Sequence, residues 1–399
     1  MISIGIDVSK GKSTTCILEP YGVVIKKPFI VEHNKDDLTA FVNLIKTYSS
    51  ESKVILEATG VYHLPILNYL ISKDIFVTVV NPLSMSKYIN SNIRPGKTDK
   101  KDALMIANYG IDNWYKLIPY SEPKFAYDKL RLLSRQYNQY IGIRVKARLT
   151  LINLVEQTMP GITNILENDS TNICKDKLNS FIKKYWHYDN VTKYSERQFV
   201  VNYNLWAKKE GYKASDAKAI KIYALAENSI PTLSSKDEST KMLVLEAIRV
   251  HREINISTDL ILGQMVEMAK PLKEYAILTS ITGIGENLAS RFIAEVGDIN
   301  KFHSSSALVA YAGIDAPPHQ SGQFISKNRR ISKRESKSLR KIGYEIMTSI
   351  TRQKSVNDPV FLFIKKKEAE GKAKKVAKIA GLNKFFRIYF AKATEIYEN

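Results

Sequence analysis

The amino-acid sequence predicts an N-terminal α/β domain followed by a longer, mostly helical remainder. Over roughly the first 120 residues, short apolar runs of strand length alternate with amphipathic segments of helical period. Beyond them, apolar side chains recur at helical spacing only. A chain of 399 residues is long enough for two or three domains. We expect these domains at residues 1–120, 121–272 and 273–399.

Five strands are predicted in the first domain. Three come first, joined by short turns and followed by a helix near 36–48; two more follow, separated by a helix near 62–73. A further helix carries Asp99 and Asp102. The expected strands are residues 2–8, 13–19, 22–30, 53–58 and 75–80. Three antiparallel strands and then two parallel ones is the order of the ribonuclease-H-like, RuvC-type junction-resolvase fold.

Four carboxylates fall where that fold would bring them together. Asp7 ends the first apolar run and Glu57 ends the fourth, while Asp99 and Asp102 are three apart and share one helix face. Carboxylates are the ligands that Mg²⁺ or Mn²⁺ prefers, and bound cations relieve the repulsion among them. The sequence thus predicts a divalent-metal site for cutting nucleic acid. Each residue alone has a structural alternative, such as Asp99 as a helix N-cap.

The charge balance predicts a polyanionic partner. The chain carries 60 Lys and Arg against 40 Asp and Glu, a net charge of +20, with a pI near 9.5.

Its two cysteines, Cys16 and Cys174, lack neighbouring ligands at metal spacing, which excludes zinc fingers and disulfide scaffolds. No segment approaches the roughly 18 apolar residues of a membrane span. We therefore expect a soluble protein of a reducing, cytoplasmic compartment.

Two long helices are predicted in the middle of the chain. Residues 125–157 have an apolar face and a basic face, and Arg144 and Arg148 on the basic face are candidate nucleic-acid contacts. Residues 238–272 could pair antiparallel with this helix as a coiled-coil arm, which usually builds oligomers. Residues 160–235 hold no motif and are interpreted as an irregular or helical insertion, with RNA contact or protomer pairing as open hypotheses.

The C-terminal third shows two features that suit a phosphate backbone. A Gly-Ile-Gly turn between two helices resembles a helix-hairpin-helix module, in which Gly283 and Gly285 let backbone amides approach a phosphate. Such a Gly-x-Gly signal is weak by itself. Residues 327–341 hold eight basic side chains against the single Glu335, although such a run can also be a solvated helix face. The basic residues are Lys327, Arg329, Arg330, Lys333, Arg334, Lys337, Arg340 and Lys341.

Several of these motifs together resemble a family of bacterial insertion-sequence transposases related to the Piv inversion recombinases. The N-terminal motifs resemble that family's DEDD domain, and the C-terminal ones its transposase domain. The N-terminal motifs are Gly5-Ile6-Asp7-Val8-Ser9-Lys10, Glu57-Ala58-Thr59-Gly60-Val61-Tyr62, Asn81-Pro82 and Lys97-Thr98-Asp99-Lys100-Lys101-Asp102-Ala103. The C-terminal motifs are the Gly-Ile-Gly turn, Tyr311-Ala312-Gly313-Ile314, Gln320-Ser321-Gly322 and Ile331-Ser332-Lys333-Arg334. Residues of about 160–240 lie outside the resemblance.

The resemblance implies a covalent mechanism with a serine nucleophile. In this family the serine becomes linked to a DNA strand while the DEDD carboxylates hold Mg²⁺, and here that serine would be Ser321. It also implies double-stranded donor and target DNA, a structured noncoding bridge RNA, and a homodimer assembling to a tetramer on the nucleoid. Without the resemblance, Ser321 before a glycine would be an ordinary turn residue. The nearest rivals are Ser304, Ser305, Ser306 and Ser326.

Three functions from different classes remain open at this point. The first is the serine transposase or site-specific recombinase. The second is a hydrolytic nuclease of the Holliday-junction type, in which water attacks and Ser321 is incidental. The third is a nucleic-acid-binding protein whose carboxylates are structural, which predicts no metal dependence and no strand cleavage. Target sequence, guide RNA structure and excision versus inversion are invisible in the protein sequence.

Overall fold

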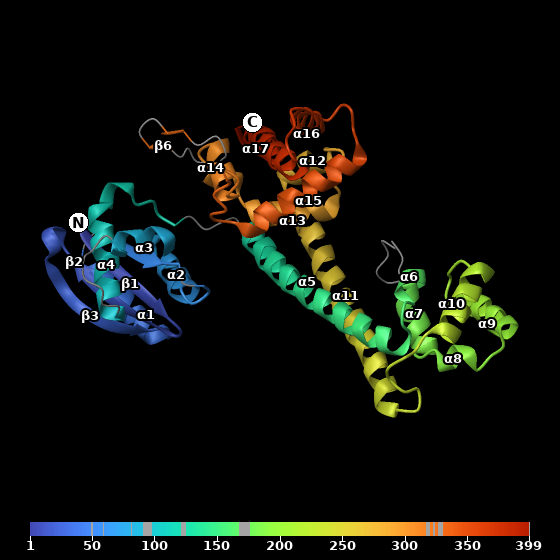
Figure 1. The fold of residues 1–399 in the computed structure, drawn as a ribbon. Coiled ribbons are helices and arrows are strands. Elements are labelled where there is room, and N and C mark those ends of the chain that lie inside the picture. The colour runs from blue at the N-terminus through green and yellow to red at the C-terminus, as the bar shows by residue number, and fades with distance from the viewer. Residues whose placement is uncertain are drawn as a thin grey trace. The chain divides into compact units, whose positions relative to one another are not determined.

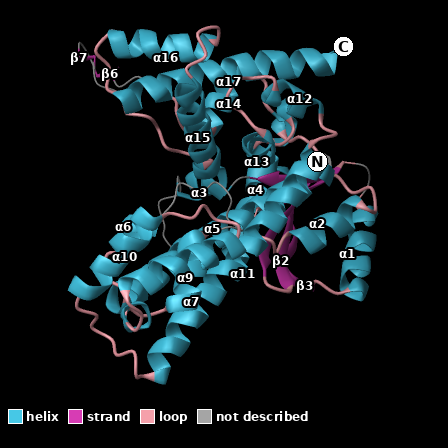
Figure 2. Cartoon of the chain, turned by 90° about the vertical axis from the view of Figure 1, so that its right-hand side faces the viewer, coloured by secondary structure: helices cyan, strands magenta, loops and turns pink. Residues whose placement is uncertain are grey.

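The computed structural model describes residues 1–48, 51–58, 60–80, 82–90, 98–120, 125–166, 176–316, 320–321, 324–325 and 330–398. It divides into two compact units, Met1–Glu122 and Pro123–Asn399 (Figure 1). Strands in the described residues occur in the sheet of the first unit and in one short hairpin of the second, and helices make up most of the rest (Figure 2). No helix in the described ranges is long and apolar enough to cross a lipid bilayer.

The first unit contains the predicted sheet of five strands, in the order β3-β2-β1-β4-β5. β1 pairs antiparallel with β2 and parallel with β4, and β4 pairs parallel with β5, which confirms the expected directions. The strands are β1 (Ile2–Ser9), β2 (Lys12–Leu18), β3 (Val24–Glu32), β4 (Ser52–Glu57) and β5 (Val77–Val80). β3 begins two residues later than expected, because Pro20–Gly22 forms a 3₁₀ turn, η1.

Helices cover both faces of this sheet. α1 (Lys35–Thr47) and α2 (Leu64–Ile71) bury one face together with Ile4 and Ile6 of β1. α4 (Asp99–Asp112) packs on the other, where Ser3 Oγ donates to the carbonyl oxygen of Ala107 at 2.6 Å. α3 (Pro82–Asn90) was not predicted, because Pro82 was interpreted only as the end of a strand. Proline also suits the first turn of a helix, where its missing N–H has no helical acceptor.

The second unit is organised by two long helices, α5 (Phe125–Thr158) and α11 (Glu238–Ala269). The late α5 residues Leu151 and Val155 share a core with the early α11 residue Val244, whereas Leu130 near the start of α5 shares another with Met265 near the end of α11. The two helices therefore run antiparallel, as the sequence predicts. Figure 1 shows the connecting segment at one end of this pair and the C-terminal helices at the other.

The connecting segment is a small helical bundle around an aromatic core. Phe181, Phe199 and Tyr203 are fully buried, and the Phe181 ring lies 5.5 Å from the indole of Trp206. The helices are α6 (Thr163–Leu166), α7 (Lys177–Tyr185), α8 (Asp189–Thr192), α9 (Glu196–Lys209) and α10 (Asp216–Asn228). Of the two interpretations offered for this insertion, the described residues show the helical one.

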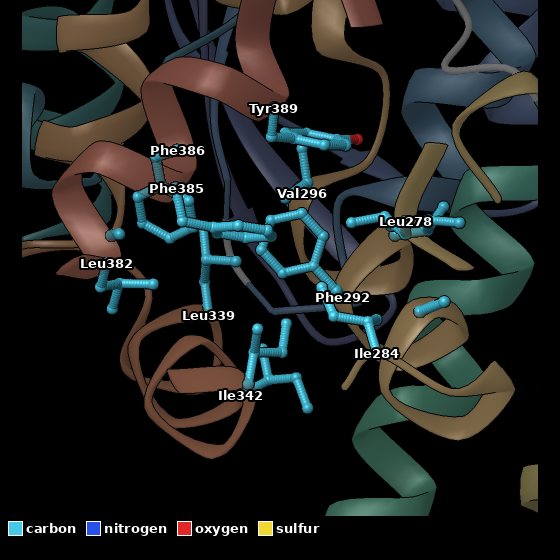
Figure 3. Packing of buried hydrophobic residues seen from close by; sticks show 14 of the residues in the cluster. Leu278, Ile284, Phe292, Val296, Leu339, Ile342, Leu382, Phe385, Phe386 and Tyr389 are labelled. Atoms are coloured by element: carbon cyan, nitrogen blue, oxygen red, sulfur yellow. The ribbon is translucent and has the colours of Figure 1, made fainter. Parts of the chain in front are cut away.

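The C-terminal helices enclose a separate core centred on Phe292. The Phe292 ring lies 5.4 Å from Phe385, 5.8 Å from Phe386 and 4.9 Å from Tyr389, each measured between ring centroids (Figure 3). The elements are α12 (Lys273–Thr279), α13 (Glu286–Val296), η4 (Ile299–Lys301), α14 (Ser305–Tyr311), α15 (Lys337–Gln353), α16 (Pro359–Ala369) and α17 (Lys374–Glu398), with the hairpin strands β6 (Gln320–Ser321) and β7 (Phe324–Ile325).

Candidate active site and nucleic-acid interface

Asp7 and Glu57 lie on neighbouring parallel strands, on the same face of the sheet. β1 and β4 are in register from Ile2 with Ser52 to Ile6 with Leu56, so Asp7 and Glu57 are the next pair along. Side chains alternate along a strand, and Gly5, two residues before Asp7, faces α4. Both carboxylates are half-buried. They therefore lie at the carboxyl ends of adjacent strands, on the face that α4 covers.

Gly5 sets how closely α4 approaches this face. A Cβ atom at Gly5 would lie 2.2 Å from the backbone nitrogen of Ala107 and 2.4 Å from the carbonyl oxygen of Ala103. Further down β1, Ser3 meets Ala107 and lies beneath Gly110. α4 thus runs antiparallel to β1, so its first turn is the part that reaches toward the Asp7 end of the strand. Gly5 was given no role of its own within the motif Gly5–Lys10, although a glycine within a strand indicates a close backbone approach.

The first turn of α4 carries Asp99 and Asp102. Thr98 caps this helix, since its Oγ1 accepts from the backbone N–H of Lys101 at 3.3 Å. The alternative in which Asp99 is the N-cap is therefore wrong: Asp99 is the first residue of the helix. Asp99 is exposed and Asp102 is half-buried. Acidic residues stabilise the first turn of a helix by opposing its dipole, so both carboxylates also favour the local structure.

These four residues have the chemistry of a divalent-metal site. All are hard oxygen donors, and two strand ends and one helix start present them on one face of the sheet. Within the described part of the chain, however, no three acidic, histidine or cysteine side chains lie close enough together to hold one ion.

Ser321 lies in the β6–β7 hairpin of the second unit. It pairs with Phe324, and residues 322 and 323 between them lie outside the described ranges. The base of the loop that carries the hairpin is closed by backbone hydrogen bonds, from Ser332 N–H to the Asp315 carbonyl at 2.8 Å and from Lys333 N–H to the Gly313 carbonyl at 2.9 Å. Ser321 thus belongs to a loop whose two ends are held together. By contrast, the rival Ser304 caps α14 and accepts from Ala307 N–H at 3.2 Å.

Part of the predicted basic run lies at the base of the same loop. Arg330, Lys333 and Arg334 are exposed in the segment that precedes α15. Lys327 and Arg329 lie outside the described residues. This part of the run is not a helix face, because α15 begins only at Lys337, after the Ser336 cap.

The turn between α12 and α13 contains Gly283 and Gly285. Gly283 has a φ of +96°, and a Cβ there would lie 3.1 Å from the Ile350 backbone of α15, so the position requires glycine. Gly285 caps α13 without a side-chain acceptor. The turn borders an open hollow of about 670 Å³, with Ser349 and Gln353 of α15 on its other side. Because Gly285 has no side chain, the first backbone amides of α13, beside this hollow, receive no hydrogen bond from an N-cap side chain.

Arg144 and Arg148, the two candidate contacts on α5, differ in their surroundings. Arg148 makes a salt bridge to Asp176 at 3.3 Å and a longer contact to Asn179 Oδ1 at 3.4 Å. Arg144 is half-buried. Both raise the local positive potential around His251, whose pKa is lowered by burial first and then by these charges. Within the described structure, Arg148 therefore joins α5 to the start of α7.

Comparison with known proteins identifies the family. Residues 4–160 match a model of DEDD transposases of the IS110 type, and residues 275–359 match the model for transposases of the IS116/IS110/IS902 family. The chain belongs to this transposase family. A DEDD-type transposase domain generally implies the use of a divalent metal ion.

Relatives of the transposase match it along most of its length. The pilin gene-inverting proteins of Moraxella bovis and Moraxella lacunata are each 24% identical over 359 residues, which cover 89% of this chain and 84% of the relative. An uncharacterized 44.8 kDa protein of insertion element IS116 from Streptomyces clavuligerus is 23% identical over 348 residues, 86% of this chain and 83% of its own. The transposase is accordingly an enzyme, a DNA transposase or recombinase.

The two family models cover both parts of the candidate site in this transposase. The first contains all four carboxylates and reaches the end of α5, and the second contains α12, α13, Ser321 and α15. Residues 161–274, which include most of the aromatic bundle, match neither model.

Proposed function

We propose that this transposase cuts and rejoins DNA through a covalent phosphoserine at Ser321, with Mg²⁺ or Mn²⁺ held by Asp7, Glu57, Asp99 and Asp102. The observation that carries the proposal is the shared face of Asp7 and Glu57, toward which the first turn of α4 extends. Because the described residues form no cluster of three ligands, we propose that the ion and the DNA phosphate draw these side chains together. The ion would act as a Lewis acid on a phosphoryl oxygen.

In the proposed reaction, Ser321 Oγ attacks a phosphorus atom and the bond to a deoxyribose oxygen breaks. The serine proton ends on that leaving oxygen, so one phosphodiester and one hydroxyl become a phosphoserine and a free strand end. Attack by another deoxyribose hydroxyl reverses the step and releases the serine, so rejoining needs no ATP. Arg330, Lys333 and Arg334, exposed at the base of the Ser321 loop, would bind the scissile phosphate and its neighbours.

The proposal includes a site shared between protomers. The carboxylates belong to Met1–Glu122 and Ser321 to Pro123–Asn399, so one protomer can supply the metal ligands and another the serine. This arrangement needs at least a homodimer, and a tetramer to hold donor and target DNA. A noncoding bridge RNA would select both duplexes. The helix-hairpin-helix role of Gly283 and Gly285 and the RuvC-type assignment of the sheet belong to the same proposal.

The decisive experiment looks for protein covalently attached to DNA. The full chain is expressed with its native flanking DNA, lysates are denatured in detergent, and adducts are separated and mapped. We expect an adduct at Ser321 that is lost in Ser321→Ala and in Asp102→Asn, but kept in the matched controls Ser304→Ala and Asp36→Asn. Asp36 is exposed on α1, away from the candidate ligands.

Two results would contradict the proposal. Metal-dependent free DNA ends without an adduct would establish the hydrolytic nuclease instead. Full strand transfer by Asp7→Ala would show that the carboxylates are structural.

A further inference from the structure

The aromatic bundle contributes to a polar cleft. α7, α9 and α11 enclose a space of about 800 Å³. Four basic side chains line it: Lys183 and Lys184 from α7, Lys209 from α9 and Arg252 from α11. All four are exposed, and none makes an ion pair within the described structure. This cleft belongs to the segment that matches neither family model.

The charge of the cleft is unbalanced. Its two carboxylates are Asp176 and Glu210, and Asp176 is already engaged by Arg148 at 3.3 Å. Partial burial first, and then repulsion from Lys209, lowers the pKa of Lys184, although Glu210 opposes both. A nearby anion would relieve that repulsion.

A recessed amide lines the cleft. Asn255 of α11 lines the cleft, and only 7% of its surface is exposed. Its side chain makes no hydrogen bond within the described structure, whereas His251, one turn earlier, bonds to Asn179 at 3.0 Å. A ligand with donors and acceptors could bond to this amide at the bottom of the cleft.

We propose that this cleft binds a single strand of nucleic acid. The basic residues would hold successive phosphates, and the Asn255 amide would bond to a phosphate or a base edge. Leu205 and Ile256, which are 61% and 38% exposed at the cleft, offer apolar contact to base faces. A duplex presents its phosphates on a convex surface and keeps its bases stacked, so it cannot reach a buried amide. The inference does not depend on the chemistry at Ser321.

The test measures equilibrium binding by the full chain. Fluorescence anisotropy follows labelled 12-nucleotide RNA, DNA of the same sequence, and the corresponding DNA duplex over a range of salt concentrations. For single strands, each phosphate contact contributes about 0.7 to the slope of log K against log salt. Lys183→Gln with Arg252→Gln should therefore lower the slope by about 1.4 and weaken single-strand binding roughly tenfold.

The matched control removes the same charge from the same bundle. Lys208 of α9 and Lys221 of α10 are exposed and do not line the cleft. Lys208→Gln with Lys221→Gln should leave the slope unchanged. Because the chain carries a net charge of +20, other basic surfaces can also attract nucleic acid, so a strand with a photoreactive base is crosslinked and its attachment mapped by peptide analysis. We expect crosslinks within residues 176–256.

Asn255→Leu separates a binding role from a structural one. It keeps the branched side-chain shape and removes the amide, so the melting temperature should change little while single-strand affinity falls several-fold. Tighter binding of RNA than DNA would indicate contact with the 2′-hydroxyl, and equal affinities would indicate phosphate contact; both support the cleft. Equal slopes for cleft and control variants would overturn the proposal. So would an equal loss of duplex binding, which would indicate a duplex site.

Discussion

The N-terminal sheet and the aromatic bundle of residues 176–228 hold their structures by different means. In the sheet, backbone pairing fixes the positions, so Asp7 and Glu57 share a face although 50 residues separate them. In the bundle, aromatic side chains such as Phe181 and Phe199 form the core between short helices. Strand register can thus place functional side chains so that a site is predictable from local sequence. An aromatic core stabilises a fold but does not indicate where a site lies.

Loss of a core aromatic in the bundle should have the largest effect on stability. Phe199 of α9 is fully buried and lies 5.4 Å from the Tyr185 ring and 5.9 Å from the Tyr223 ring. Phe199→Ala should cost about 3–5 kcal/mol, because it removes apolar burial and leaves a cavity. Hydrogen exchange of the peptides from 176–228, followed by mass spectrometry, measures the lost protection.

The control for this substitution lies on the same helix. Val201 is 58% exposed, so Val201→Ala should change stability by less than about 0.5 kcal/mol. The sheet should keep its protection in both variants. Loss of protection in β1 and β4 as well would show that the sheet and the bundle unfold together, and would contradict their independent stability.

The next effect concerns the sheet and its closeness to α4. Gly5→Ala places a Cβ against backbone atoms of α4, and backbone cannot rotate away as a side chain can. We expect a cost of about 1–3 kcal/mol or more in the first unit, together with loss of DNA cleavage, because the first turn of α4 moves away from Asp7. Chemical denaturation followed by exchange in β1 gives the first quantity, and the yield of covalent adduct gives the second.

A glycine without such contacts provides the comparison. Gly142 in α5 has no atom near its missing Cβ, so Gly142→Ala should be neutral or stabilising by up to about 1 kcal/mol. Serine carries the same Cβ atom as alanine. If Gly5→Ala unfolds the first unit, Gly5→Ser should therefore leave it unfolded too, even in a purified, metal-saturated sample. Normal cleavage by Gly5→Ala would mean that the contact between α4 and β1 does not position the carboxylates.

The sequence was informative where local pattern determines structure. The apolar runs ending in Asp7 and Glu57 predicted two of the strands, and the succession of runs and short turns predicted their order. The pairing of α5 with α11 followed from helical period in the same way. The antiparallel direction of α5 and α11 could be predicted on the single assumption that a compact insertion joins the two helices.

Other features depend on contacts that local pattern does not contain. The role of Gly5 depends on α4, about 100 residues later in the chain, and the salt bridge of Arg148 depends on Asp176. α3 was missed because Pro82 suits both the end of a strand and the start of a helix. The cleft around Asn255 gathers residues of three helices, none of which carries a motif.

The smallest effect should be a pH dependence that arises where α11 packs against α5 and α7. His251 of α11 is 6% exposed, and its pKa lies below the ordinary 6.5, because burial and then Arg148 and Arg144 of α5 disfavour the charged ring, while Asp176 opposes them. Between the folded pKa and 6.5 the unfolded chain therefore binds more protons than the folded one. Stability rises with pH across that window and is lost as the pH falls below 6.5.

His251→Asn should remove this contribution, because asparagine stays neutral and can keep the bond to Asn179. The measurement is the difference in unfolding free energy between wild type and variant at pH 7.5 and 5.5, read from exchange in α7 and α11. Subtraction matters, because carboxylates throughout the chain also begin to titrate in acid. Wild type should lose more stability than the variant on acidification. Equal losses would mean that His251 gains its proton without disturbing the packing of α5, α7 and α11.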